Sequence, residues 1–330
     1  MAESFRAFVV NKTDEAFEAG VKELSKDALP AGDVLIKVVY SGINYKDGLA
    51  SIPNGQVVRK YPFVPGIDLA GHVVESSDRR FRENDEVIVT SYNLGVSHFG
   101  GFSEYARVPA AWVVPVPRGL SLREAMILGT AGFTAALAVH KLELNGLQPE
   151  SGPVLVTGAT GGVGSTAISM FSNLGYTIAA STGKQSEEAY LKGLGASEIL
   201  SREDVTADSG KPLDKERWAG SVDSVGGSTL AYLTRTTKYS GSIASVGVTG
   251  GPKVPATVFP FILRGINLLG IDSVNCPMEL RLNLWERLAS DLKPKNLEGL
   301  VAREVGLAAL PEATAEILGA KVRGRILVKP

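Results

Sequence analysis

The stretch Val154-Leu-Val-Thr-Gly-Ala-Thr-Gly-Gly-Val-Gly164 decides the fold of this chain. It starts with a short apolar run, within residues 153–157, that predicts a buried strand. Residues 166–174 then have helical periodicity and stop before Gly175, a residue that commonly follows a helix C-terminus. The sequence therefore predicts a strand, a tight glycine-rich turn and a helix.

The turn carries Ala159-x-Gly161-x-x-Gly164, the dinucleotide fingerprint with alanine in its first position. Gly161 allows the backbone to approach a pyrophosphate, and Gly164 allows the helix to pack closely on the strand. Free N–H groups at the helix N-terminus are donors for phosphate. A tight turn without a ligand is the alternative, but it does not require four glycines. The predicted cofactor contacts of the turn are Thr160, Gly161, Gly162, Val163 and Gly164.

Outward from this turn, short apolar runs alternate with helical segments of about ten residues. This alternation is typical of a parallel sheet covered by helices on both faces, the Rossmann arrangement. The expected strands are 176–180, 198–200, 221–225, 242–246 and 266–271, and the expected helices are 123–142, 187–194 and 230–238.

The first 120 or so residues follow a different pattern, in which strand follows strand without a long helix between them. This pattern favours an antiparallel, partly closed sheet. The expected strands are 4–11, 33–40, 86–91 and 104–108, and the tail adds a helix over 279–292 and a final strand over 324–328.

The end of the second Rossmann strand predicts the type of dinucleotide. NAD-binding proteins place a carboxylate there, on the ribose 2′-hydroxyl. Here the strand ends in Ser181-Thr-Gly-Lys184, which can hold a 2′-phosphate and has no carboxylate to repel it. We therefore predict NADP(H), with contacts from Ser181, Thr182, Gly183, Lys184 and, after the next strand, Arg202. Solvated side chains are the alternative for Lys184 and Arg202.

Composition excludes several classes of protein. The 330 residues carry 34 Lys+Arg and 35 Asp+Glu, so the net charge of −1 gives no general attraction to nucleic acid or to anionic membranes. A single cysteine excludes a disulfide scaffold and a cysteine-rich zinc module. No apolar run reaches the ~20 residues of a membrane span, and the N-terminus lacks a signal-peptide core. We expect a cytoplasmic protein.

Beyond the glycine turn, four further motifs follow in order: Ser41-Gly-Ile-Asn-Tyr-Lys-Asp47, Val64-Pro-Gly-Ile-Asp-Leu-Ala-Gly71, Gly129-Thr-Ala-Gly-Phe-Thr-Ala135 and Pro260-Phe-Ile-Leu-Arg264. With these motifs the chain resembles the medium-chain dehydrogenases/reductases. The similarity is greatest to the zinc-independent quinone oxidoreductase branch and its YhdH/YhfP family, which includes acryloyl-CoA reductase. The resemblance implies a GroES-like, partly open β barrel (residues 1–124 and 275–330), a Rossmann NADP-binding domain (residues 125–274) and a homodimer in which 266–271 is the candidate pairing strand.

Zinc-dependent relatives place cysteine where Asn44 stands and a His-Glu pair where Ile67-Asp68 stands. The residues here do not supply three nitrogen, sulfur or carboxylate ligands by that plan, so we expect no zinc. Without a strong Lewis acid, the expected chemistry is hydride transfer from NADPH to an electron-poor double bond, as in a 2-enoyl-CoA thioester. A quinone is the alternative acceptor. A crystallin-like protein that binds NADPH without catalysis is the further alternative.

The resemblance also suggests roles for individual residues. Asn44 is a candidate to hold the oxyanion, and Tyr45 to donate a proton or contact the nicotinamide, with packing as its alternative role. Further expected cofactor contacts, each with an alternative, are Thr130 (or a helix N-cap), Gly247 and Val248 (or a mobile turn) and Arg325 (or a surface ion pair). Arg59 and Lys60 are exposed loop cations or contacts for a CoA phosphate.

Overall fold

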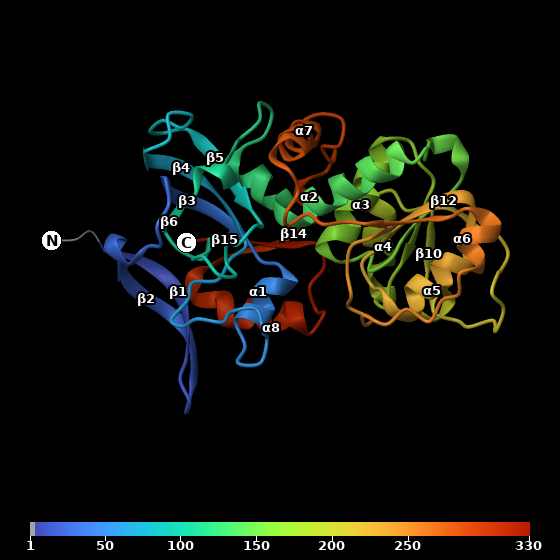
Figure 1. Ribbon diagram of the computed structural model, residues 1–330, viewed down its shortest axis with the longest axis horizontal. Helices are drawn as coiled ribbons and strands as arrows, with labels where there is room; N and C mark the ends of the chain where they lie inside the picture. Colours follow the sequence, from blue (N-terminus) through green and yellow to red (C-terminus); the bar gives the residue numbers. More distant parts are fainter. Residues whose placement is uncertain (1–3) are drawn as a thin grey trace. The chain divides into compact units, whose positions relative to one another are not determined.

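The computed structural model describes residues 4–330, and the chain divides into two compact units (Figure 1). Unit 1 contains residues up to Thr130, Val274–Ala289 and Leu297–Pro330. Unit 2 contains Ala131–Ser273 and Ser290–Asn296. The first boundary therefore falls at Thr130, six residues later than the sequence suggested, and a short piece of the tail belongs to unit 2.

Unit 1 has a seven-stranded sheet in the order β14-β15-β3-β4-β5-β7, with β6 paired to β3. All of its pairs are antiparallel except β14–β15. The fold is the predicted GroES-like barrel. The strands are β3 (Val34–Gly42), β4 (Asp68–Ser76), β5 (Glu86–Thr90), β6 (Tyr105–Val108), β7 (Val114–Pro115), β14 (Val301–Gly306) and β15 (Arg325–Lys329).

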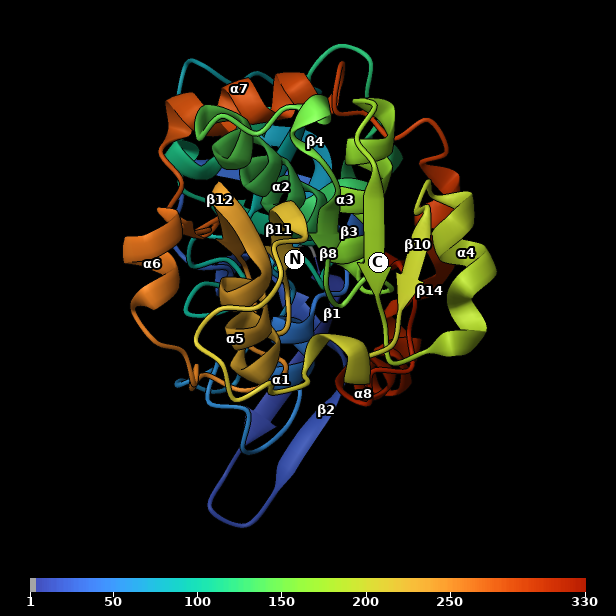
Figure 2. The same ribbon diagram turned by 90° about the vertical axis from the view of Figure 1, so that its right-hand side faces the viewer.

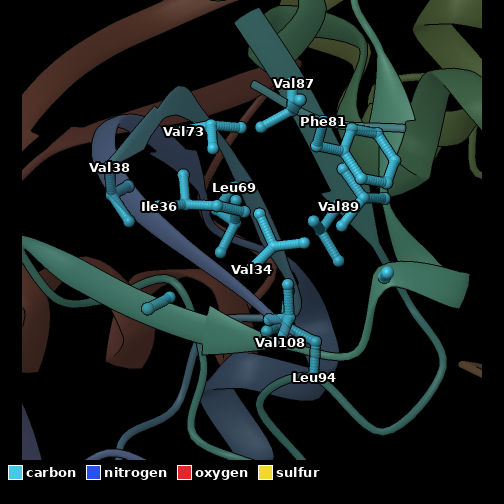
Figure 3. Close-up of a cluster of buried hydrophobic side chains, with 13 residues drawn as sticks. Val34, Ile36, Val38, Leu69, Val73, Phe81, Val87, Val89, Leu94 and Val108 are labelled. Carbon is cyan, nitrogen blue, oxygen red and sulfur yellow. The ribbon is translucent and has the colours of Figure 1, made fainter. Parts of the chain in front are cut away.

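The interior of this sheet is aliphatic. Val34 and Ile36 of β3, Leu69 of β4 and Val87 of β5 are all fully buried and point into one cluster (Figure 3). Alternation along β3 and β4 places these side chains on the inner face, as period-two patterning requires. Burial of this kind contributes about 25 cal/mol per Å² of apolar surface.

A separate hairpin, β1 (Ser4–Lys12) and β2 (Phe17–Ser25), forms a two-stranded sheet (Figure 1). The sequence predicted β1 but not β2, because β2 is mostly polar and exposed. The helices of unit 1 are α1 (Tyr45–Ala50), α7 (Met278–Leu288) and α8 (Leu310–Leu318), and α1 packs against α8.

Unit 2 has a six-stranded parallel sheet in the order β10-β9-β8-β11-β12-β13. Numbered from the glycine turn, this is the 3-2-1-4-5-6 order of a Rossmann domain, as predicted. In Figure 2, α4 lies beside β10 and α6 beside β12. The strands are β8 (Val154–Val156), β9 (Ile178–Ser181), β10 (Glu198–Leu200), β11 (Trp218–Asp223), β12 (Thr237–Ser245) and β13 (Asn267–Gly270). The helices are α3 (Gly162–Asn173), α4 (Glu188–Gly193), α5 (Gly227–Thr236) and α6 (Phe259–Arg264).

Helix α2 (Leu122–Leu144) covers the predicted helix 123–142, but it is interrupted at Gly129. By length and composition it could cross a membrane, with a mean hydropathy of 1.4, although 83% of its most apolar window is buried inside the protein. Gly129 has a φ of 50° and breaks the helix there, so neither part reaches ~20 residues. The apolar character of α2 is that of a core helix.

Candidate active site

The glycine turn of unit 2 is tightly folded. The N–H of Gly161 donates to the carbonyl of Gly158 at 3.0 Å, and α3 begins at Gly162 with Gly161 as its N-cap. A Cβ at position 164 would lie 2.6 Å from the Gly158 carbonyl oxygen and 2.8 Å from the Ala159 Cα. A Cβ at position 161 would have only the Gly158 oxygen within 4 Å, at 3.3 Å. Gly164 therefore serves packing, whereas the space at Gly161 is open to a ligand.

A second turn is held to the first by a buried carboxylate that the sequence analysis missed. Asp223, at the end of β11, accepts a hydrogen bond from Thr157 Oγ1 at 2.5 Å and from the N–H of Gly226 at 2.9 Å. Burial raises the pKa of Asp223, and these hydrogen bonds oppose that rise. Its signal in the sequence was one acid at the end of an otherwise uncharged strand segment, Trp218–Asp223.

The predicted turn at Gly247 and Val248 packs on this second turn. The N–H of Gly250 donates to the Val225 carbonyl at 2.7 Å, and Gly226 faces the Gly251 carbonyl. Val248 is 66% exposed, so its side chain has no packing role in unit 2. The carboxyl ends of β8, β11 and β12 therefore lead into adjacent turns, where open α/β sheets bind ligands.

The residues proposed for a 2′-phosphate also come together. The guanidinium of Arg202 lies against the bare Cα of Gly183, since a Cβ there would be 2.7 Å from Nη2. The N–H of Lys184 donates to Thr182 Oγ1 at 3.0 Å, and burial lowers the pKa of the Lys184 ammonium. Ser181 is buried and donates to the Ser201 carbonyl at 3.3 Å. The segments 181–184 and 201–202 are thus in contact, with the guanidinium of Arg202 against Gly183.

Unit 1 holds a buried ion pair at the strand ends. Arg325, at the start of β15, and Asp68, at the start of β4, lie 3.2 Å apart between Nη2 and Oδ2. Both side chains are almost completely buried. The other nitrogens of Arg325 donate to the carbonyls of Ile127 and Ile43, each at 3.1 Å. The burial of this pair corrects the alternative of a surface ion pair at Arg325, whereas the predicted cofactor contact of Arg325 stays a prediction.

Asn44 joins the same network. Its Nδ2 donates to Asp68 Oδ2 at 2.8 Å, and its Oδ1 accepts from Arg325 Nη1 at 3.0 Å. Both ends of the amide are therefore engaged within unit 1. Asn44 therefore positions the loop that precedes Tyr45, and its predicted oxyanion contact stays a prediction.

Asp47 is a second buried carboxylate, one turn along α1. It accepts from the N–H of Asn44 at 2.7 Å and from the N–H of Ile67 at 2.9 Å. Burial, with a smaller effect of the Asp68 charge, raises the pKa of Asp47 to about 7, although these two N–H bonds act in the opposite direction. The network thus contains two carboxyl groups and one guanidinium.

Thr130 follows the break at Gly129, and the carboxylate of Asp68 accepts its hydrogen bonds. The N–H of Thr130 donates to both carboxylate oxygens of Asp68, at 3.0 and 3.1 Å, and the Thr130 hydroxyl donates to Oδ1. The predicted N-cap position is thus capped by Asp68 rather than by Thr130 itself, and the Thr130 hydroxyl points to a carboxylate.

Tyr45 is the predicted site residue in unit 1 whose polar group is left open. It is 48% exposed, and within residues 4–330 its phenol has no hydrogen-bond partner. The hydrogen bonds of Asn44 and Asp47 fix the start of α1 and therefore the position of Tyr45.

The arrangement does not fit a catalytic zinc ion. Among residues 4–330, no group of three or more His, Cys, Asp and Glu side chains comes together to hold a metal. At the positions where zinc-dependent relatives have ligands, Asn44 offers an amide and Asp68 is already bonded to the Arg325 guanidinium. The positive charge of Arg325 beside the Asp68 carboxylate disfavours binding of Zn²⁺ at that carboxylate.

The fold and the glycine turn define a two-domain dehydrogenase of the GroES-like and dinucleotide-binding type. Residues 30–118 match the family described as alcohol dehydrogenase GroES-like domain, and residues 162–290 match zinc-binding dehydrogenase. The chain is 57% identical to the putative quinone oxidoreductase YhfP of Bacillus subtilis over 100% of both chains. It is 51% identical to the acrylyl-CoA reductase AcuI of Ruegeria pomeroyi over 98% of both.

Solved structures agree with these similarities. The crystal structure of B. subtilis YhfP with NAD bound has a TM-score of 0.98 at 57% identity and covers 100% of both chains. The YhdH oxidoreductase of Salmonella enterica in complex with NADP has a TM-score of 0.96 at 45% identity and covers 98% of this chain and 99% of its own. The chain belongs to the medium-chain dehydrogenases/reductases, in the YhdH/YhfP family of the quinone oxidoreductase branch.

Proposed function

We propose that the protein is an NADPH-dependent, metal-independent reductase of activated C=C bonds, with 2-enoyl-CoA thioesters such as acryloyl-CoA as its substrate class. The full-length similarity to an acrylyl-CoA reductase carries this proposal. The unpartnered phenol of Tyr45 and the open glycine turn support it.

Residues of unit 2 fit the dinucleotide. The backbone of 160–164 would hold the pyrophosphate, because Gly161 leaves space and α3 supplies N–H donors. Arg202, Lys184 and Ser181 would hold the 2′-phosphate, and the Gly247 turn would contact the nicotinamide end. Bound NADPH supplies the hydride.

In unit 1, Tyr45 would supply a hydrogen bond or a proton to the substrate, and the residues around it would fix its position. Hydride addition to the β-carbon of an enoyl thioester places negative charge on the thioester oxygen, which needs a hydrogen-bond donor and then a proton at the α-carbon. Tyr45 can supply the hydrogen bond or the proton. The hydrogen bonds among Asn44, Asp47, Asp68 and Arg325 hold its loop in place.

The relatives carry NAD in one structure and NADP in another, so cofactor preference requires its own test. Arg202→Gln together with Lys184→Gln is expected to raise the KM for NADPH by about 10–100-fold and to leave the KM for NADH nearly unchanged. Equal changes for both cofactors would mean that these cations do not contact a 2′-phosphate.

A second copy of the chain is the proposed partner. Strand β13 is an edge strand, and it is accompanied by exposed apolar residues. These are Val258, Ile262, Leu263 and Leu268. Edge strands of this kind pair across a two-fold axis in closed dimers. Light scattering is expected to show a dimer, and Leu268→Lys with Ile262→Lys to show a monomer.

The substrate test compares initial rates of NADPH oxidation with acryloyl-CoA and with 1,4-benzoquinone, with free acrylate as the control. The proposal expects a kcat/KM above about 10⁴ M⁻¹s⁻¹ for the thioester and slow quinone turnover. Turnover of quinone alone would favour the alternative function of an NADPH:quinone oxidoreductase, which agrees with the name of the B. subtilis relative.

A further inference from the structure

Five cationic side chains lie in two segments of unit 1 that are distant in the sequence. Residues 44–66 and 317–324 contain a single carboxylate, Asp47, which is buried. In a chain with a net charge of −1, these segments form a local excess of positive charge. We call this set the basic patch, and its members are Lys46, Arg59, Lys60, Lys321 and Arg323.

Packing brings the two segments together. Val57, Val58 and Tyr61 share one hydrophobic cluster with Ile317 and Val322. Helix α1 lies beside α8 (Figure 1), and a Cβ on Gly48 would be 2.8 Å from Leu318 Cγ. Arg59 and Lys60 therefore lie on a loop that shares this hydrophobic cluster with the end of α8, where Lys321 and Arg323 follow. Lys46 lies on α1, next to the same contact.

Four of the five cations of the patch are available to a ligand. Within residues 4–330, Lys46, Arg59, Lys60 and Lys321 have no carboxylate partner. Arg59, Lys60 and Lys321 are exposed.

The loop that carries Arg59 and Lys60 is nevertheless anchored. Val58 is buried, and the ring of Tyr61 meets Phe17 edge-on at 6.3 Å. The ammonium of Lys12 donates to the Pro53 carbonyl at 2.9 Å. An anchored loop loses less conformational entropy on binding than a mobile one.

We infer that the basic patch binds the phosphate groups of the CoA portion of the substrate. This inference rests on the proposed function. Tyr45 immediately precedes Lys46, so the patch starts beside the residue proposed to face the thioester. CoA carries a 3′-phosphate and a pyrophosphate at the far end of its pantetheine arm, and clustered cations bind such groups by charge-assisted hydrogen bonds. A quinone has no group for this surface to recognise.

Two substrates and one pair of charge reversals test the inference. Acryloyl-CoA and acryloyl-pantetheine, which lacks the phosphates, are compared in the wild-type protein and in Arg59→Glu/Lys60→Glu. The variant is expected to raise the KM for acryloyl-CoA by about tenfold or more and to change kcat/KM for acryloyl-pantetheine less than twofold. Added salt should likewise raise the KM of the CoA ester alone.

Matched controls separate the patch from general charge and from the cofactor. Arg79→Glu/Arg118→Glu makes the same charge change on unit 1, and Arg79 lies beyond the far end of β4, about 26 Å along the strand from Asp68. This control should leave the KM for acryloyl-CoA within twofold. The KM for NADPH should be unchanged in both variants, because a rise there would assign the patch to the cofactor and overturn the inference.

Calorimetric titration of CoA into the NADPH-saturated protein separates failure of the inference from failure of the proposed function. If the wild-type protein reduces both thioesters and charge reversal affects them equally, the inference is wrong and the proposed function stands. If it reduces neither thioester, the proposed function fails, and absence of CoA binding then overturns the inference too. CoA binding that is lost in Arg59→Glu/Lys60→Glu and retained in the Arg79→Glu/Arg118→Glu control supports it.

Discussion

Arg325 and Asp68 form an ion pair that is enclosed by two glycines. A Cβ on Gly42 would lie 2.6 Å from Arg325 Nη2, and a Cβ on Gly129 would lie 2.5 Å from Asp68 Oδ2. Gly42 of the motif Ser41–Asp47 and Gly129 of the motif Gly129–Ala135 are thus explained by one feature. The ion pair needs backbone without side chains on two of its sides.

Removal of the arginine should destabilise the protein strongly. Arg325→Met leaves Asp68 charged and buried without its cation, so we expect the free energy of unfolding to fall by about 3–5 kcal/mol. The matched control is Arg303→Met, which breaks an exposed pair with Glu316 and should cost about 1 kcal/mol or less. Urea denaturation measures both. Equal losses would mean that the Arg325–Asp68 pair is not the buried linkage described.

The pH dependence of stability should report the carboxyl of Asp47. The unfolded chain releases this proton near pH 4, whereas the folded chain holds it up to about pH 7. Between these values, the free energy of unfolding contributed by Asp47 falls as pH rises, by at most about 1.4 kcal/mol per pH unit, and the fall ends above pH 7. Urea denaturation from pH 5 to 8 in the wild-type protein and in Asp47→Asn checks this. The same slope in both proteins would rule out Asp47 as the source.

Two glycines of the cofactor turn should respond differently to alanine. In Gly164→Ala the new methyl group meets backbone atoms at 2.6 and 2.8 Å, so we expect a lower melting temperature. In Gly161→Ala it meets one oxygen at 3.3 Å, so the fold should persist while the KM for NADPH rises. Thermal denaturation and initial rates distinguish the two, and a Gly161→Ala protein with a normal KM would remove residue 161 from the cofactor site.

The hydroxyl of Tyr45 should be needed for turnover rather than for stability. It has no partner within residues 4–330, so Tyr45→Phe should leave the melting temperature unchanged. Loss of a proton donor should lower kcat by about 10²–10⁴-fold with little change in the KM for NADPH. Asn44→Ala is the comparison, because it should lower stability as well through the loss of bonds to Asp68 and Arg325. Full turnover by Tyr45→Phe would end its role as donor.

Local chemistry made unit 2 predictable from the sequence. Strand β8 is apolar throughout, and the glycine turn carries its function in eleven consecutive residues. Helix α1 was not predicted because six residues are too few to show a period. Helix α8, which has nine residues, was not predicted either, although it buries one face.

The network around Asp68 was beyond prediction for a different reason. Its members, Asn44, Asp47, Asp68, Thr130 and Arg325, are brought together by strand pairing and by the break in α2 rather than by sequence spacing. An acid within the apolar run 63–70 and an arginine beside the apolar run 326–328 were the available signals. Each of these two residues indicated a buried charge, but the sequence did not indicate which residue would pair with it.

Transfer of an isotope label from the cofactor to the product tests whether the protein adds hydride to the activated double bond. The protein is given acryloyl-CoA and NADPH that carries deuterium at C4 of the nicotinamide, on either face in separate runs, and the product is analysed by mass spectrometry and NMR. Hydride addition to the activated double bond predicts one deuterium at C3 of propionyl-CoA from one of the two cofactors and, in D₂O, a solvent deuteron at C2. Propionyl-CoA without label at C3, or NADPH oxidation without propionyl-CoA, would contradict the account.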